Sequence, residues 1–182
     1  MLLNKLKILL VVAVASISIA SAANPFSKSE TRDIEPFSKI EVGGLVNVKI
    51  NQGDVPSAYI SAYGIDMSDI ITRVEDDTLF ITTKGNHRGE SIHIDITYLQ
   101  LSEIKTSGVA TIKTDGALAS EKLRINITGN GDAKLAIDTQ DLVIHMQGNG
   151  NLQVSGTTNT QAITSHGGGG RLDNSNLDIR SI

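Results

Sequence analysis

The sequence predicts an all-β fold, a parallel β-helix-like solenoid with repeats of about 19–21 residues and glycine-rich corners. Two observations carry this prediction. From Ser38 onward, apolar and polar residues alternate with a period of two, which is typical of half-buried strands. In the second half, glycines recur at a nearly constant spacing, at Gly108, Gly129, Gly148 and Gly167. A unit of that length cannot bury its apolar side alone, whereas stacked units share one core.

Residues 1–23 have the composition of a secretory signal peptide. A positively charged start and a short apolar run precede a small-residue cleavage region that contains Ala20, Ala22 and Ala23. The apolar run is shorter than the ~20 residues that a membrane-spanning helix needs. We therefore expect an exported protein in the periplasm, on the cell surface or in the medium, with no transmembrane anchor after cleavage.

Residues 24–36 are expected to form an N-terminal linker, and residues 37–182 the solenoid domain. Within that domain, alternation predicts strands over residues 39–44, 46–51 and 92–97, separated by turns rich in glycine and aspartate. Residues 65–72 are the one stretch that could form a turn of helix.

The second half of the chain repeats an alternating strand, a glycine-rich corner and a second short strand. Residues 123–131 match residues 142–150. Corner glycines are expected because a tight corner needs positive φ and close backbone approach, and the candidates are Gly108, Gly129, Gly131, Gly148, Gly150 and Gly167. The last corner has two possible registers, since Gly168 can replace Gly167 as the matching residue.

Stacking of these corners would bring polar side chains into register. It would place Asn130 above Asn149, and Asp132 near Asn151, as a hydrogen-bonded ladder on the surface. Two interpretations of this ladder stay open. It can contact a partner, or it can serve only to stabilise the corners.

The order and spacing of three motifs resemble a known bacterial family, the putative auto-transporter adhesin head GIN domain. Residues 37–53 look like its opening strand pair, residues 72–81 are similar to its turn followed by Leu-x-Ile, and the corners at 128–131 and 147–150 match its repeated Ser-Gly-x-Gly corners. The resemblance covers about residues 32–181. It implies an exported, parallel β-helix-like protein, and it supplies no catalytic residues.

The sequence departs from that family pattern at its C-terminal end. Family members continue through more rungs, whereas this chain ends at Ile182, inside what looks like the next strand. A solenoid normally ends in a polar cap, because an open last rung exposes unpaired backbone. Truncation within a repeat and a completed domain are both compatible with the sequence.

Composition excludes several classes of function. Without Cys, the chain has no disulfide framework, no cysteine-ligated metal and no thiol nucleophile. Its 16 Lys and Arg against 20 Asp and Glu give a net charge of −4, which argues against binding nucleic acid. The paired corner glycines lack the third glycine and following helix of a dinucleotide loop, and there is no P-loop.

No cofactor or metal is expected. The four histidines, His87, His93, His145 and His166, lack the spacing of a zinc site. Calcium needs several converging oxygens, and residues 129–132 resemble calcium-binding glycine-rich repeats only faintly.

We expect a non-catalytic module that acts as an adhesin-like or cell-envelope binding or scaffold protein, with an unidentified protein or glycan partner. The alternative is a β-helix polysaccharide-degrading enzyme, a lyase or hydrolase, which needs carboxylates and basic residues on one face. Its candidates are Asp132, Lys134, Asp138, Asp141, Arg171 and Asp173. All six aromatic residues precede residue 99, so the repetitive half lacks the aromatic platforms usual in sugar-processing grooves.

Overall fold

The structure is a computed structural model that describes residues 27–85 and 90–180. The expected signal peptide, including Ala20, Ala22 and Ala23, lies outside the described residues. The described residues form the following elements: β1 (Ser27–Asp33), β2 (Lys39–Val42), β3 (Asn47–Gln52), β4 (Ser57–Tyr63), the 3-10 helix η1 (Met67–Asp69), β5 (Ile70–Glu75), β6 (Thr78–Thr83), β7 (Ser91–Tyr98), β8 (Glu103–Thr106), β9 (Thr111–Gly129), β10 (Asp132–Gly148), β11 (Leu152–His166) and β12 (Leu172–Ile179). Within residues 27–85 and 90–180, no helix is both long and apolar enough to cross a membrane.

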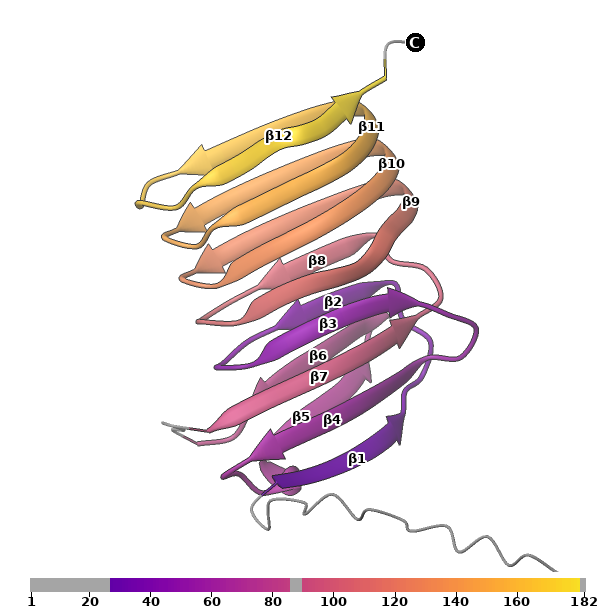
Figure 1. Ribbon diagram of the computed structural model, residues 1–182, viewed down its shortest axis with the longest axis vertical. Helices are drawn as coiled ribbons and strands as arrows, with labels where there is room; N and C mark the ends of the chain where they lie inside the picture. The colour runs from indigo at the N-terminus through magenta and orange to yellow at the C-terminus, as the bar shows by residue number, and fades with distance from the viewer. Residues whose placement is uncertain (1–26, 86–89, 181–182) are drawn as a thin grey trace, which may run out of the picture.

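The strands form one curled, open sheet whose two layers face each other (Figure 1). The hydrogen-bonded order is β1-β4-β7-β3-β9-β8-β2-β6-β5, and β10, β11 and β12 continue from β9. The long strands β9, β10 and β11 bend, so that each contributes first to a front layer with β1, β4, β7, β3 and β12. Each then contributes to a back layer with β5, β6, β2 and β8. The predicted all-β fold class is confirmed.

Pairing along β9, β10, β11 and β12 is parallel. Between β10 and β11 the offset stays constant, from Ala133 opposite Leu152 to Gln147 opposite His166. Between β9 and β10 the register shifts at a bulge near Ala136. Antiparallel pairs occur between β1 and β4, β4 and β7, and β5 and β6.

The core lies between the two layers and consists of aliphatic side chains in register. In the back layer, Ile40, Ile104, Ile125 and Ile144 stand opposite one another on successive strands, and none is more than 1% exposed. Burying each such side chain contributes roughly 1.5–3 kcal/mol. Each strand therefore stabilises both of its neighbours.

The segment expected to be a linker contains β1, so that expectation is wrong for Ser27–Asp33. The strand is almost entirely polar, which hides it from a search for apolar alternation. It is held by the guanidinium of Arg32, which donates to the carbonyl oxygens of Ile70 at 2.7 Å and Met67 at 2.8 Å, and to Thr72 Oγ1 at 3.0 Å. The residues that accept these bonds lie in and beside η1, which falls within residues 65–72, where a turn of helix was expected.

Candidate binding surface

Glycine corners connect the back layer to the front layer on one side of the molecule. At Gly148, φ is +128°, and a Cβ atom would lie 2.2 Å from the Gly129 carbonyl oxygen. At Gly150, a Cβ atom would lie 2.1 Å from the Gly131 carbonyl oxygen. Real Cβ atoms do not come this close to backbone oxygen, so these corners exclude any residue with a side chain.

Four of the six expected corner glycines, Gly108, Gly129, Gly148 and Gly167, have positive φ, and Gly131 packs against Ala110. In the last corner, Gly168 lies over Gly148, because its Cβ would stand 2.0 Å from the Gly148 carbonyl oxygen. A Cβ on Gly167 would have nothing within 4 Å. Of the two registers left open by the sequence, the one with Gly168 is therefore present.

The four ladder residues lie together along these corners. Asn149 Nδ2 donates to Asn130 Oδ1 at 3.2 Å, and Asn149 Oδ1 accepts from Gly169 N at 2.7 Å. Asp132 Oδ1 accepts from the backbone N of Asn151 at 3.0 Å and from its Nδ2 at 2.9 Å. All four side chains are exposed. The ladder thus joins the corners that follow β9, β10 and β11, while its outer atoms face solvent.

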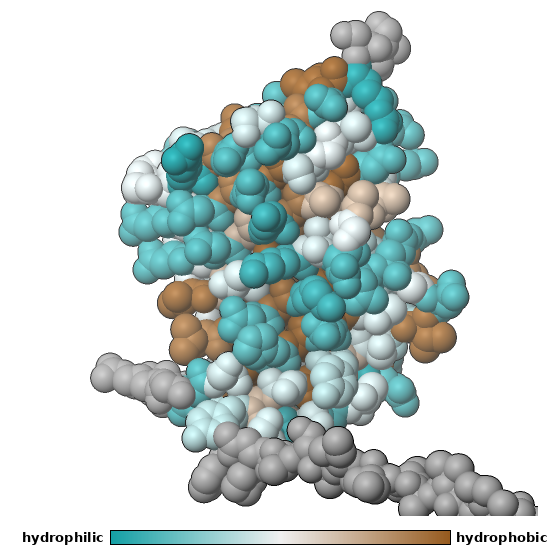
Figure 2. Space-filling model, in the orientation of Figure 1, coloured by the Kyte–Doolittle hydropathy of each residue, from teal (hydrophilic) through white to brown (hydrophobic). Residues whose placement is uncertain are grey.

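Beside the ladder, a groove of about 540 Å³ crosses the front layer. Its buried lining residues are Ala133 and Leu152. Its polar lining comes from alternate positions along β9 to β12 and from the residues just before β11 and β12. The polar lining residues are Thr111, Lys113, Asp132, Lys134, Asn151, Gln153, Arg171 and Asp173. A second hollow of about 280 Å³ shares Thr111 and Lys113 and extends the groove over β3 and β7. Figure 2 shows mainly hydrophilic side chains on this face of the molecule.

Four of the six residues considered for an enzyme line this groove: Asp132, Lys134, Arg171 and Asp173. Asp173 Oδ1 accepts hydrogen bonds from Ser175 Oγ at 2.7 Å and Ser175 N at 3.1 Å. These bonds, with a smaller contribution from the Arg171 charge, lower the pKa of Asp173. A general acid working near neutral pH needs a raised pKa instead. Asp173 is therefore an ionised acceptor.

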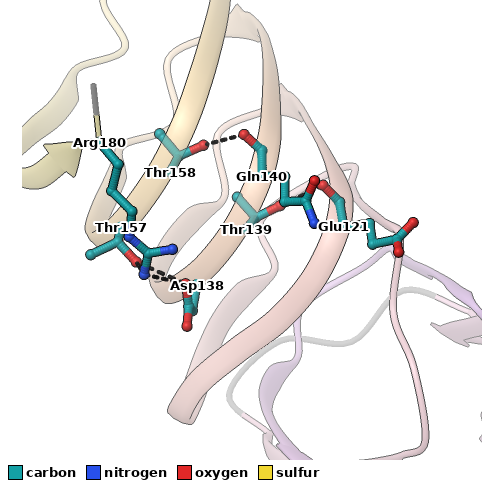
Figure 3. A network of polar contacts seen from close by, with 7 residues as sticks. All are labelled: Glu121, Asp138, Thr139, Gln140, Thr157, Thr158 and Arg180. Carbon is teal, nitrogen blue, oxygen red and sulfur yellow. Dashed lines mark hydrogen bonds and ion pairs between the residues drawn. The ribbon is translucent and has the colours of Figure 1, made fainter. Parts of the chain in front are cut away.

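The remaining two candidates, Asp138 and Asp141, lie at the opposite corner of the sheet, where Figure 3 shows a polar network. Asp138 Oδ1 accepts from Thr157 Oγ1 and from Arg180 Nη2, each at 2.8 Å. The Thr157 bond first, and then the Arg180 bond and charge, lower the pKa of Asp138. Asp141 Oδ1 accepts from Thr160 Oγ1 at 2.6 Å. Both carboxylates are thus bound to neighbouring rungs.

Buried threonines complete this corner. Thr139 and Thr158 are in register on β10 and β11. Thr158 Oγ1 lies 2.8 Å from the Thr160 carbonyl oxygen and 3.2 Å from that of Gln140. Thr139 Oγ1 makes the equivalent contacts, at 3.3 Å, with Asp141 and Glu121. Because the same contacts recur on both strands, we assign this polar network to stabilising the corner of the sheet.

Replacing Thr158 by Val keeps the side-chain shape and removes the hydroxyl that these carbonyls share. We expect the free energy of unfolding to fall by about 1–2 kcal/mol, because a buried acceptor then lacks its donor. Urea denaturation followed by circular dichroism measures the change. The control is Thr164→Val, at a half-buried position whose side chain has no hydrogen bond with the described part of the chain. It should change the free energy by about 0.5 kcal/mol or less. Equal effects of the two substitutions would contradict this role of the buried hydroxyl.

Among residues 27–85 and 90–180, no three His, Asp or Glu side chains gather closely enough to hold a metal ion. His145 and His166 lie on the paired strands β10 and β11, two positions apart in register, whereas His93 lies on β7. His87 falls outside the described residues.

The lysine row in the groove was missed from the sequence. Lys49, Lys113 and Lys134 stand opposite one another on β3, β9 and β10. The sequence did contain one signal for this row. Lys113 and Lys134 occupy the same outward position, two residues after the first residue of β9 and of β10. The parallel pairing of β3 with β9 was needed to add Lys49.

Comparisons with known proteins agree on the fold. A family model described as "Putative auto-transporter adhesin, head GIN domain" matches residues 36–182. No curated protein matches the sequence. Among solved structures, a "putative adhesin" of Bacteroides fragilis is 23% identical with a TM-score of 0.77, and the match covers 85% of this chain and 73% of that one. A "putative lipid binding protein" of Parabacteroides distasonis is 17% identical with a TM-score of 0.65, covering 85% of this chain and 76% of its own. A "putative cell adhesion protein" of Clostridium sporogenes is 15% identical with a TM-score of 0.52, covering 81% of this chain and 99% of its own.

Proposed function

The chain belongs to the head GIN domain family of putative auto-transporter adhesins, and we propose that it is an exported, non-catalytic module that binds a component of the cell envelope or cell surface. Export is supported by the signal-peptide composition of residues 1–23. Binding is supported by the groove of about 540 Å³ beside the corner ladder, which is the observation that carries the proposal.

The same proposal includes a β-solenoid architecture for the C-terminal half. Parallel pairing places Gly148 opposite Gly129, so the offset of β9 and β10 after the bulge equals the 19-residue spacing of these two corner glycines. The same offset continues between β10 and β11, where Met146 lies opposite Ser165. This agreement supports stacked coils. Stacked coils repeat outward positions at the strand spacing of about 4.8 Å. A surface of that kind offers rows of similar groups, which suits an extended ligand held by many weak contacts.

Hydrogen bonding of the groove's carboxylates supports a non-catalytic role. Asp132 accepts a hydrogen bond from Asn151, and Asp173 accepts one from Ser175. A polysaccharide-degrading enzyme remains the second candidate, because four residues suited to it line one groove. Incubation with acidic and neutral polysaccharides, followed by assay of reducing ends and of unsaturated products, distinguishes the two, since only an enzyme releases products.

Retention by isolated cell-envelope and glycan fractions tests the proposed function. The chain is expressed at full length and purified in the form that the cell produces, and circular dichroism confirms its strand content. Saturable retention is expected. A folded protein that no fraction retains would contradict a binding role.

Replacing Asn130, Asp132, Asn149 and Asn151 together by Ser should weaken that retention about tenfold, because the outer amide and carboxylate groups are lost along the edge of the groove. The matched control replaces four exposed amides elsewhere, Gln100, Gln140, Gln147 and Asn176, and should leave retention within about twofold. Thermal denaturation of both variants shows whether folding is kept. Unchanged retention by the folded ladder variant would assign the ladder to corner stability alone.

A further inference from the structure

We propose that the front-layer groove binds an acidic polysaccharide, with Lys113, Lys134 and Arg171 as the groups that meet its carboxylates or sulfates. This inference rests on the proposed function, because it names the class of ligand for the same surface. It is carried by the arrangement of charge across four neighbouring strands.

The lysine row is only partly neutralised by the protein. Lys49, Lys113 and Lys134 stand opposite one another on strands that lie about 4.8 Å apart. Like charges placed directly opposite on adjacent strands destabilise a sheet. Lys49 has acidic partners, with Nζ 3.3 Å from Asp115 Oδ2 and 3.9 Å from Asp95 Oδ2. Lys113 and Lys134 form neither an ion pair nor a side-chain hydrogen bond with the residues that the structure describes.

The two carboxylates in the groove do not form ion pairs with Lys113 or Lys134. Asp132 Oδ1 is bound to the backbone and side-chain nitrogens of Asn151, and Asp173 Oδ1 to Ser175. Arg171, which is exposed at the same groove, likewise has no ion pair within 4 Å among the described residues. The groove therefore presents three cations without a close ion pair among the described residues, against two carboxylates that each have one oxygen engaged. The charge of Arg171 still acts on Asp173, but from beyond ion-pair distance. An anionic ligand would relieve the repulsion that the protein leaves between Lys113 and Lys134.

The groove's other groups identify the kind of anion. Thr111, Asn151 and Gln153 line the same groove and can hydrogen-bond sugar hydroxyls. None of the exposed large hydrophobic residues lines the groove, so it offers nothing that would insert into a lipid surface. It has no aromatic lining residue on which a base or a neutral sugar ring could stack. Charge and hydrogen bonding together fit a polysaccharide that carries repeated carboxylates or sulfates.

The test measures binding of polygalacturonate to the full-length expression product, with neutral dextran, single-stranded DNA and phosphatidylglycerol vesicles as the other arms. The test variant is Lys113→Gln with Lys134→Gln. The control variant is Lys122→Gln with Arg124→Gln, which removes the same charge from exposed positions outside the groove. We expect polygalacturonate binding that weakens with added salt, and a loss on the order of tenfold in the test variant but not in the control. The melting temperature of the test variant should stay unchanged or rise, because a repulsive pair has been removed.

Four results would overturn the inference. If the test and control variants lose polygalacturonate binding equally, the binding depends on net charge and not on the groove. Binding of DNA or vesicles, but not of polygalacturonate, with loss in the test variant would replace the polysaccharide by that class of ligand. If polygalacturonate does not bind while envelope fractions still retain the protein, the acidic polysaccharide is rejected and the proposed function stands. If neither polygalacturonate nor any envelope fraction binds, the acidic polysaccharide and the proposed function are both rejected.

Discussion

Replacing Gly148 by Ala is expected to lower the free energy of unfolding by about 2–5 kcal/mol. The backbone at Gly148 has φ +128°, which a residue with a side chain adopts at a cost of about 1–2 kcal/mol. The new Cβ would also lie 2.2 Å from the Gly129 carbonyl oxygen and 2.8 Å from the Gly129 nitrogen. Both are backbone atoms fixed in the rung below, so the contact can be relieved only by separating the rungs, at about 1–3 kcal/mol. Urea denaturation followed by circular dichroism measures the total.

Gly116→Ala is the matched control for this substitution. Gly116 also has a positive φ, of +88°, but a Cβ there would meet nothing within 4 Å. It therefore shows the conformational cost alone, about 1–2 kcal/mol. The difference between the two variants isolates the contact between stacked corners. Equal losses would mean that the rungs at Gly148 and Gly129 are not packed as the structure has them.

The stacking of the corners could be predicted from the sequence, because glycine pairs that recur at a constant spacing indicate corners that lie over one another. Two corners of the form Gly-Asn-Gly, at residues 129–131 and 148–150, leave Asn130 and Asn149 as the tip residues of successive units. The step to the next corner could not be fixed, because four consecutive glycines, Gly167 to Gly170, fit two registers equally well. The backbone contacts of Gly168 with Gly148 and of Gly170 with Gly150 distinguish them.

Other features left no readable signal. Strand β1 is held by Arg32 and by backbone pairing with β4, and it lacks the apolar alternation that reveals a strand. The hollow that extends the groove depends on β9 pairing with β3, which lies far earlier in the chain, before the repeats begin. Spacing within the repeats cannot reveal a pairing between a repeat and a strand outside them. The position of Lys113 opposite Lys49 therefore had to come from the structure.

Replacing Ile144 by Ala should lower the free energy of unfolding by about 2–5 kcal/mol. Ile144 is fully buried in the back layer, opposite Ile125 on one side and Ile163 on the other. The backbones of the three strands are fixed by parallel pairing, so the core cannot collapse into the space that the side chain leaves. The loss therefore includes a cavity cost as well as the lost burial.

Ile163→Ala provides the matched comparison, because Ile163 occupies the next position of the same column and is 40% exposed. Its truncation removes the same atoms but leaves a space that water can enter, so the expected loss is about 1 kcal/mol or less. Urea denaturation of both variants gives the two values under identical conditions. A larger loss for Ile144 would show that packing between rungs, rather than the identity of the side chain, sets the stability. Equal losses would mean that another surface covers Ile163 in solution.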